Sequence, residues 1–447
     1  MAAFTRFFRA LLSLLACLSF AEACFLTAFA QQPIKFDAAT ISGLPIRNIG
    51  SAAMSGRIAA VDAIEKNGRI TVFVGAASGG VWKSVNGGTT FKPVFDRESV
   101  QSIGAVAIDK SNPQIVWVGT GEAWTRNSVS IGDGIYKSTD GGENWTNMGL
   151  KDSEHIAKIL VDPKDSNTVL ACATGHVWND NDERGVFKTT DAGKTWKKVL
   201  GGANGSTGCG MIARSPQEPG TIFASMWDFR RQGWTFRSGG PGSGLYKSTD
   251  GGEHWAELSD NNSKGLPEKP YGRIALAVAT SKPQVVYAMI ESKKSALFRS
   301  DDGGQNWKRL DSSQFMIWRP FYFANLIVDP KDEKKIFKPD GPLLLSVNGG
   351  ESFSSVANAH GDFHDVWVNP DNPNIVFTGD DGGLWRSSDG GTRWKHQLNL
   401  PVSQFYHVST DNANPYHVYG GLQDNSSWVG DSSYPGGVSN SRWENIY

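Results

Sequence analysis

One eight-residue pattern, Ser/Thr-x-Asp/Asn-x-Gly-x-x-Trp/Phe, recurs seven times in this chain of 447 residues. Successive copies begin 41 to 59 residues apart, a spacing typical of the blades of a β-propeller. A chain of this length exceeds one ordinary compact domain unless that domain is repetitive. The copies are Ser84–Phe91, Ser138–Trp145, Thr189–Trp196, Ser248–Trp255, Ser300–Trp307, Ser346–Phe353 and Ser387–Trp394.

Each residue type of the pattern suits a hairpin corner. The Asp or Asn side chain accepts hydrogen bonds from the amides of its own turn. The Gly can adopt the positive φ that a tight turn needs. The aromatic residue begins the next strand and can pack between neighbouring sheets. The octapeptides are therefore predicted to be turns that join two antiparallel strands.

The sequence around each turn predicts four short strands. In the second unit, 103–109 alternates like a strand, 110–113 is a turn, 115–119 is a second strand and 134–138 leads into the octapeptide. We therefore predict an all-β fold, a β-propeller of four-stranded antiparallel blades, with seven blades in residues 53–400. Residues 401–447 resemble the start of an eighth unit or of a second propeller, so we expect the chain to continue beyond Tyr447.

The first thirty residues have the features of a secretory signal peptide. Arg6 and Arg9 precede a largely apolar stretch, and Ala28-Phe29-Ala30 forms a small-residue cleavage site. We predict cleavage after Ala30, a lead-in over 31–52, and a secreted or periplasmic protein with no membrane span after cleavage. An uncleaved anchor, or lipid attachment at Cys17, is the alternative.

Charge and cysteine content restrict the partners. The formal net charge is −1, which gives no basic surface for a nucleic acid. Cys172 and Cys209 remain after signal removal in a compartment that permits disulfides. Sequence alone leaves open whether they are bridged or are two buried thiols.

The blade pattern also divides the loops between two ends. The octapeptides and the short turns between first and second strands share one end, and the irregular loops and inter-blade connections lie at the other. Long irregular loops on a repetitive scaffold are the usual place for ligand binding. A polypeptide or a glycan suits their aromatic and charged side chains. The candidate ligand-binding residues are Arg57, Trp124, Arg126, Trp178, Arg184, Trp227, Arg230, Trp234, Arg319, His360, His364, Asp381 and Asp424. Alternatively, these Trp side chains cap the blades and the Arg side chains pair with nearby Asp.

The octapeptides STDGGENW and SDDGGQNW resemble the bacterial neuraminidase repeat, or Asp box. Longer strings, among them GAASGGVWKS, HGDFHDVWVNP and YGGLQDNSSW, are similar to bacterial exported proteins of the sortilin-type Asp-box propeller family. The resemblance covers essentially everything after residue 40. It implies a propeller whose relatives bind polypeptides inside the ring or cleave xyloglucan with two Asp residues. Members are often labelled glycosyl hydrolases.

The resemblance to xyloglucan-cleaving enzymes can be compared with this sequence one catalytic residue at a time. The resemblance places one catalytic acid at Asp380, in Gly379–Gly383, but Ala77 stands where the other acid is expected. Inverting hydrolysis needs both carboxyl groups, and Glu122 is the candidate substitute. No motif marks the arginine triad and Tyr nucleophile of a sialidase.

His360, Asp362 and His364 are spaced by two residues, which would place them on one side of a strand and make them a candidate transition-metal site. The alternative is a hydrogen-bonded network between blades. Asp380, Asp381 and Asp424 could bind calcium or cap turns. No cofactor fingerprint is present, so no cofactor is expected.

The sequence leaves three hypotheses for the function. The leading hypothesis is a ligand-binding module, the second is a glycoside hydrolase, and the third is a structural part of a larger exported protein.

Overall fold

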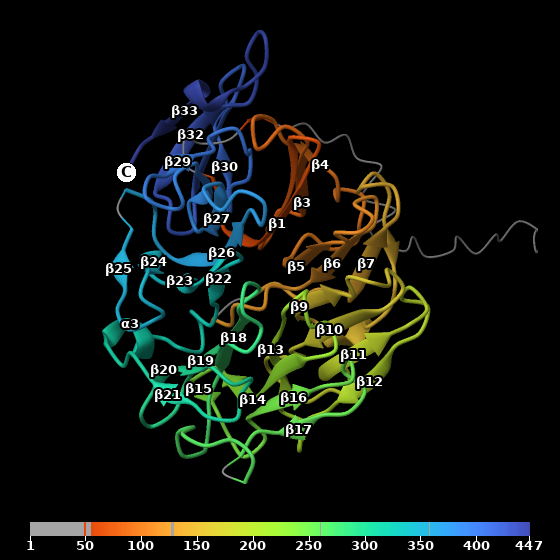
Figure 1. Ribbon diagram of the computed structural model, residues 1–447. Helices are drawn as coiled ribbons and strands as arrows, with labels where there is room; N and C mark the ends of the chain where they lie inside the picture. Colours follow the sequence, from red (N-terminus) through yellow and green to blue (C-terminus); the bar gives the residue numbers. More distant parts are fainter. Residues whose placement is uncertain (1–48, 51–54, 127–128, 260, 357) are drawn as a thin grey trace, which may run out of the picture. The chain divides into compact units, whose positions relative to one another are not determined.

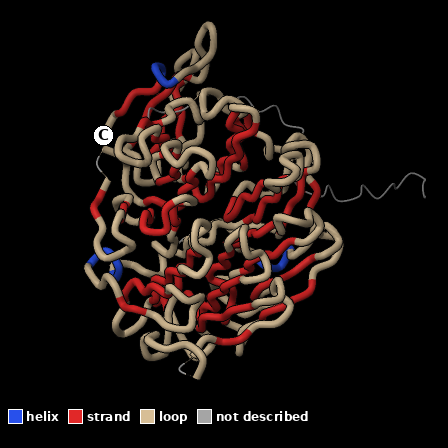
Figure 2. The backbone as a smooth tube through the Cα atoms, in the orientation of Figure 1, coloured by secondary structure: helices blue, strands red, loops and turns tan. Residues whose placement is uncertain are grey.

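The computed structural model describes residues 49–50, 55–126, 129–259, 261–356 and 358–447. The predicted signal peptide and nearly all of the lead-in lie outside these residues, so both stay predictions. Strands and loops make up almost all of the described chain, and its helical segments are short (Figure 2). None of the helices in the described part is long and apolar enough to cross a bilayer.

The strands form eight antiparallel sheets in chain order. The first four sheets are β1 to β4 (Ile58–Lys66, Arg69–Ala76, Val81–Ser84, Lys92–Pro93), β5 to β8 (Ile103–Ile108, Val116–Thr120, Ile135–Ser138, Thr146–Asn147), β9 to β12 (Ile156–Val161, Val169–Ala173, Gly185–Thr189, Lys197–Leu200) and β13 to β17 (Thr207–Arg214, Ile222–Gln232, Thr235–Ser238, Gly244–Ser248, Ala256–Glu257). The last four are β18 to β21 (Ile274–Val278, Val286–Ile290, Ala296–Ser300, Lys308–Arg309), β22 to β25 (Ile327–Asp329, Asp332–Lys338, Leu344–Ser346, Ser354–Ser355), β26 to β29 (Phe363–Val368, Val376–Asp380, Gly383–Ser387, Lys395–His396) and β30 to β33 (Ser409–Thr410, His417–Gly421, Ser427–Asp431, Trp443–Asn445). The helical segments among the described residues are η1 (Lys151–Ser153), α3 (Gln314–Ile317) and η2 (Asn440–Arg442).

The first strands of seven sheets surround a common centre. Strand β1 packs against β5 and against β26, and the other first strands contact one another in chain order (Figure 1). The backbone amide of Val61 in β1 donates a hydrogen bond of 3.0 Å to Asp365 in β26, which joins the first of these sheets to the seventh. The predicted all-β propeller of four-stranded blades is confirmed. The domain boundaries at residues 52 and 400 stay predictions.

The octapeptides form the predicted hairpin corners. In the second sheet, Ser138 Oγ donates to Asp140 at 2.8 Å and accepts the amide of Gly142 at 2.7 Å, while Asp140 accepts the amide of Asn144 at 2.9 Å. Gly141 and Gly142 have φ of 71° and 89°. The Gly141 amide also donates to the carbonyl of Gln114, which lies in the turn between β5 and β6. The corner and the turn between the first two strands therefore share one end of the sheet.

Two sheets differ from the sequence prediction. The segment 226–241, expected as a loop, is largely a hairpin, because β14 continues to Gln232 and pairs with β15. The last unit has all four strands, β30 to β33, although it lacks an Asp box. Its buried core is small and consists of Leu422, Trp428 and Trp443.

Cys172 and Cys209 form a disulfide, which settles the alternative left open by the sequence. Cys172 lies in β10 and Cys209 in β13, so the bond joins the third sheet to the fourth. Both side chains are fully buried. The bond agrees with the predicted export to an oxidising compartment.

Candidate functional site

Arg57, which directly precedes β1, is the centre of a buried charged cluster. Its Nε and Nη2 atoms donate to the two carboxylate oxygens of Asp381 at 2.6 and 2.7 Å. Burial alone would lower the pKa of Arg57, but the hydrogen bond to Asp381 and the charges of Asp381 and Glu122 outweigh it, so the pKa is raised. The guanidinium is therefore a fixed, charged anchor in the site.

Two more carboxylates approach Arg57 from other segments. Glu122, in the loop between β6 and β7, lies 3.5 Å from Arg57 Nη1 and 3.5 Å from Arg126. Asp424, between β31 and β32, lies 3.5 Å from Arg57 Nη2 and is exposed. Neither Glu122 oxygen has a hydrogen-bond partner among the described residues, although the residue is 1% exposed. The cluster therefore retains acceptors that are not saturated by the protein.

The loop that carries Glu122 is held by a close backbone contact. Gly121 has a φ of 82°, and a Cβ atom there would lie 1.7 Å from the carbonyl oxygen of Glu154. The amide of Glu122 donates to Ser102 Oγ at 3.0 Å. Only glycine fits at position 121, because both the positive φ and the close approach exclude a side chain.

Asp381 connects Arg57 to a histidine. His364 Nε2 lies 2.8 Å from Asp381 Oδ1, and Asn425 Nδ2 donates to the Asp381 backbone carbonyl at 2.8 Å. Burial would raise the pKa of Asp381, but the hydrogen bonds of His364 and Arg57 prevail and lower it well below its usual range. Asp381 is therefore ionised and is unsuited to donate a proton.

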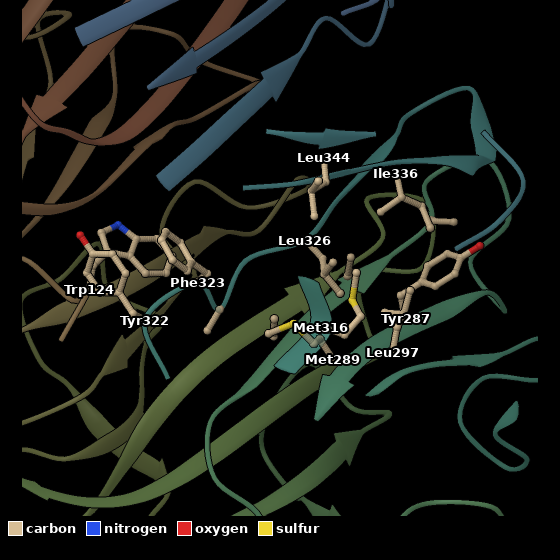
Figure 3. Close-up of a cluster of buried hydrophobic side chains, with 14 of the residues drawn as sticks. Trp124, Tyr287, Met289, Leu297, Met316, Tyr322, Phe323, Leu326, Ile336 and Leu344 are labelled. Atoms are coloured by element: carbon tan, nitrogen blue, oxygen red, sulfur yellow. The ribbon is translucent and has the colours of Figure 1, made fainter. Parts of the chain in front are cut away.

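Aromatic side chains line the same cluster. The Trp124 ring stacks on His364 with centroids 6.0 Å apart, and Tyr322 meets His364 edge-on at 5.6 Å. The Arg319 guanidinium lies 4.6 Å from the centre of the Tyr322 ring. Trp124 and Tyr322 belong to a buried hydrophobic cluster that also includes Phe323 (Figure 3). The rings are thus held by the core and not only by the charged groups.

Arg273, in the connection that precedes β18, supports this aromatic wall. It is fully buried, with its guanidinium 5.3 Å from the Trp124 ring and 4.7 Å from the Trp227 ring. It donates to the carbonyl of Phe321 at 2.9 Å. Burial lowers the pKa of Arg273 to about 10. Sequence reasoning missed Arg273 because it precedes an ordinary first strand, and it also missed Tyr322 and Asn425, although the segments 317–323 and 423–425 stood out.

The structure brings together eight of the thirteen predicted ligand-binding residues. Arg57 contacts Asp381, Glu122 and Asp424, and the stacked aromatic side chains extend the cluster. The members are Arg57, Trp124, Arg126, Arg319, His360, His364, Asp381 and Asp424. They come from inter-blade connections and from loops between second and third strands. We call this set, with Glu122 and Tyr322, the Arg57 cluster.

The other five predicted residues belong to the third and fourth sheets. Trp178 and Trp234 are exposed by 51% and 84%, and Arg230 pairs with Asp180. Trp227 was expected at the surface but is fully buried, because β14 is longer than the sequence indicated and Trp227 packs on Phe229.

Arg184 was expected at the surface as well, but it is 2% exposed. Its guanidinium donates to the backbone carbonyls of Thr174 and Ser206 at 3.2 Å and to that of Asn179 at 3.0 Å. It therefore holds the loop after β10 in place. Arg184 and Trp227 are therefore both buried and packed within the protein, and their roles in ligand binding stay predictions.

Asp380, which the sequence predicts to be a catalytic acid, is not accessible to solvent. It is 0% exposed, and its Oδ1 accepts the amide of Gly382 at 2.9 Å. Burial raises its pKa well above the usual range. The carboxyl group is therefore a buried acid, while the neighbouring Asp381 carries the contacts to Arg57 and His364.

The predicted metal triplet is not arranged as expected. Strand β26 begins only at Phe363, and Asp362 has a φ of 57°, so the two-residue alternation of a strand does not apply to His360 and Asp362. His360 Nε2 lies 3.2 Å from the carbonyl oxygen of Asp424, whereas His364 faces Asp381. Within the described residues, no group of three His, Cys, Asp or Glu side chains is placed to hold a metal ion.

His155 should make the fold sensitive to pH. It is fully buried next to the Glu154 carbonyl that contacts Gly121, and burial lowers its pKa from 6.5 to about 4. As the pH falls, the His155 side chain is protonated in the unfolded chain before it is protonated in the folded protein. The contribution of neutral His155 to the free energy of unfolding is therefore fully present above pH 6.5 and decreases as the pH falls toward 4. The expected loss is about 3 kcal/mol. Urea unfolding of wild type and His155→Gln from pH 7 to pH 4 should show a flatter profile for the variant. Parallel profiles would contradict the assignment.

The repeated octapeptides and the four-stranded sheets together define an Asp-box β-propeller. The family model "BNR/Asp-box repeat" matches residues 298–309, and the model "Sortilin, neurotensin receptor 3" (Sortilin-Vps10) matches residues 79–228. The resemblance seen in the sequence is therefore confirmed.

Relatives include two proteins named xyloglucanase. That of Hypocrea jecorina (strain QM6a) is 27% identical over 227 residues, 46% of this chain and 25% of its own length. That of Paenibacillus sp is 25% identical over 231 residues, 46% of this chain and 21% of its own length. The alignments thus span about a quarter of these relatives.

Solved structures with a similar arrangement have low sequence identity. The GH74 xyloglucanase from Xanthomonas campestris is 14% identical, with a TM-score of 0.43, and the match covers 90% of this chain and 75% of that one. YCF48 from Cyanidioschyzon merolae is 14% identical, with a TM-score of 0.48, and the match covers 75% of this chain and 96% of that one.

Proposed function

We propose that this chain is a binding module that acts outside the cytoplasm and holds a glycan at the Arg57 cluster without cleaving it. The observation that carries the proposal is the cluster itself. Inter-blade connections and second-to-third-strand loops bring one buried guanidinium, three carboxylates and a histidine together beside two aromatic rings. Fixed polar groups beside aromatic faces are typical of sites that orient a polar ligand.

The carboxylates favour binding over hydrolysis. Inverting hydrolysis needs a carboxylic acid at the leaving oxygen and a carboxylate at the attacking water. Asp381 is held ionised by Arg57 and His364, and Glu122 lies between two arginines. Burial raises the pKa of Asp380 well above its usual range, and the side chain is fully buried. Ala77 occupies the position at which the resemblance implies the second acid. Among the described residues, these carboxyl groups do not form the acid and base pair that inverting hydrolysis requires.

A glycan is preferred to a polypeptide as the ligand because curated relatives are named xyloglucanases. The exposed carboxylate of Asp424 can accept hydrogen bonds from hydroxyl groups. One property still supports the hydrolase alternative: the raised pKa of Asp380 is what a general acid requires. It would need the segment 379–383 to move and expose that carboxyl group.

Binding and cleavage can be separated with xyloglucan oligosaccharides. We expect calorimetry to detect binding and a reducing-end assay to detect no release. Asp424→Ala should weaken binding about tenfold, because a charged hydrogen-bond acceptor contributes roughly 1.5–3 kcal/mol. The matched control is Asp301→Ala, which removes an exposed carboxylate at the second position of the Asp box Ser300–Trp307.

Release of reducing ends that is lost in Asp380→Asn would establish the hydrolase instead. A polypeptide that binds with the same dependence on Asp424, in the absence of glycan binding, would overturn the choice of ligand.

A further inference from the structure

A cavity lies among the first strands, at the end where the Asp boxes lie. Its volume is about 300 Å³, and the first strands β1, β5, β9 and β26 form its walls. The turns after β5, β9 and β13 line it as well, through 109–110, 162–163 and Pro216. These turns share an end with the Asp boxes, whereas the Arg57 cluster is built from the opposite loops. The cavity is therefore separate from the Arg57 cluster.

The inner end of this cavity is nearly closed. A much smaller space of about 10 Å³ adjoins it and shares Val106, Lys158 and Asp365 as lining residues. Such a volume holds no more than about one water molecule. Ala59 and Gly104 are among the residues that line this narrow part. The cavity is thus a blind pocket, with Lys158 and Asp365 at its inner end.

Most charged groups of the pocket have partners within the protein. Lys110 contacts Asp62 at 2.6 Å, and Arg214 contacts Asp162 at 3.2 Å. Lys158 differs from them: its ammonium has no hydrogen-bond or ion-pair partner among the residues that the structure describes. A cation with three unused donors therefore sits in the pocket.

The carboxyl group of Asp365 does not neutralise Lys158 by direct contact. Its oxygens accept the amides of Val61 and Val366 at 3.0 Å and the Asn325 side chain at 3.1 Å. Burial raises the pKa of Asp365, although the charge of Lys158 and these hydrogen bonds oppose the shift. Because the protein's own donors occupy the Asp365 oxygens, Lys158 keeps its donors for an acceptor from outside the protein.

The walls between Lys158 and the outer turns are mainly apolar. They include Val61, Ile108, Val161, Val366 and Trp367. An apolar body would be shielded from water here, while a charged head group reached Lys158. The volume is at the lower end of small-molecule sites, which are roughly 300–1,000 Å³. It suits one ring or a short alkyl chain.

We propose that this pocket binds a small carboxylic acid with an aromatic or short aliphatic body, whose carboxylate pairs with Lys158. Such a ligand satisfies the unused ammonium donors and covers the apolar walls together. The site is independent of glycan binding at the Arg57 cluster.

The test is a titration of the purified chain with benzoate and hexanoate, observed by saturation-transfer NMR and calorimetry. Benzamide and hexanamide serve as neutral analogues of the same size. We expect the acids to bind at least about tenfold more tightly than the amides, since a charge-assisted hydrogen bond contributes roughly 1.5–3 kcal/mol. Lys158→Met should lose this difference, and Lys158→Arg should retain the acid preference.

The matched control is Lys308→Met, an exposed lysine on β21 that should bind like wild type. Thermal unfolding of each variant shows whether it is folded before titration. Three outcomes would each overturn the proposal. They are equal binding of acids and amides, unchanged binding of the acids by Lys158→Met, and no detectable binding of either acid at concentrations up to roughly 20 mM.

Discussion

Replacing Arg57 with Met is expected to lower the free energy of unfolding by about 3–5 kcal/mol. The substitution leaves the carboxylates of Asp381 and Glu122 buried without the guanidinium that lies 2.6 and 3.5 Å from them. Removing one partner of a buried ion pair costs more than the pair contributes, because the remaining charge stays desolvated. Urea unfolding at pH 7, followed by tryptophan fluorescence, measures the change.

Two further variants make this result interpretable. Arg57→Lys keeps the charge but not the two parallel hydrogen bonds to Asp381, so an intermediate loss is expected. Arg69→Met removes an exposed arginine of β2 and should change stability by less than about 0.5 kcal/mol. The deficit of Arg57→Met should shrink toward acidic pH, because Asp381 can then be protonated. A deficit below about 1 kcal/mol at pH 7 would show that the cluster tolerates the loss of its cation.

Loss of the disulfide should cost about 4 kcal/mol in unfolding free energy. Cys172 and Cys209 are separated by 37 residues, and closing a loop of that length reduces the entropy of the unfolded chain by an amount equivalent to about 4 kcal/mol. The double variant Cys172→Ala/Cys209→Ala should therefore unfold at lower urea concentration. Wild type unfolded in the presence of dithiothreitol should behave in the same way.

The double variant is its own control for the reductant. It has no bond to reduce, so its unfolding curve should be identical with and without dithiothreitol. If wild type were equally insensitive to reductant at equilibrium, the bond would not contribute to stability. A loss in the variant but not in reduced wild type would instead point to the cavity left by two buried side chains.

Local sequence was sufficient to predict the blades and their turns. In Ser138–Trp145, Ser138, Asp140 and the following glycines make their contacts within eight residues, so the turn geometry is encoded where it occurs. The 41–59 residue period then requires four short strands per unit. The same reasoning failed for Trp227, because nothing local indicates that β14 continues past the sheet into a hairpin.

The site was predictable as a set of loops but not as a set of contacts. Asp380 and Asp381 are adjacent in sequence and both buried, yet Asp380 accepts the amide of Gly382 whereas Asp381 binds Arg57 and His364. Their roles depend on which side each faces where β27 ends, which the resemblance to a family motif did not reveal. The pairing of Cys172 with Cys209 likewise depends on the approach of two sheets.

The sequence by itself determined the repeated unit, the position of its turns and the end of each blade at which irregular loops gather. All of these follow from interactions between residues close together in the chain. Only the tertiary structure decided which charges meet, because Arg57, Glu122, Asp381 and Asp424 come from segments up to several hundred residues apart. Their contacts exist only once the first strand of the first sheet packs beside that of the seventh.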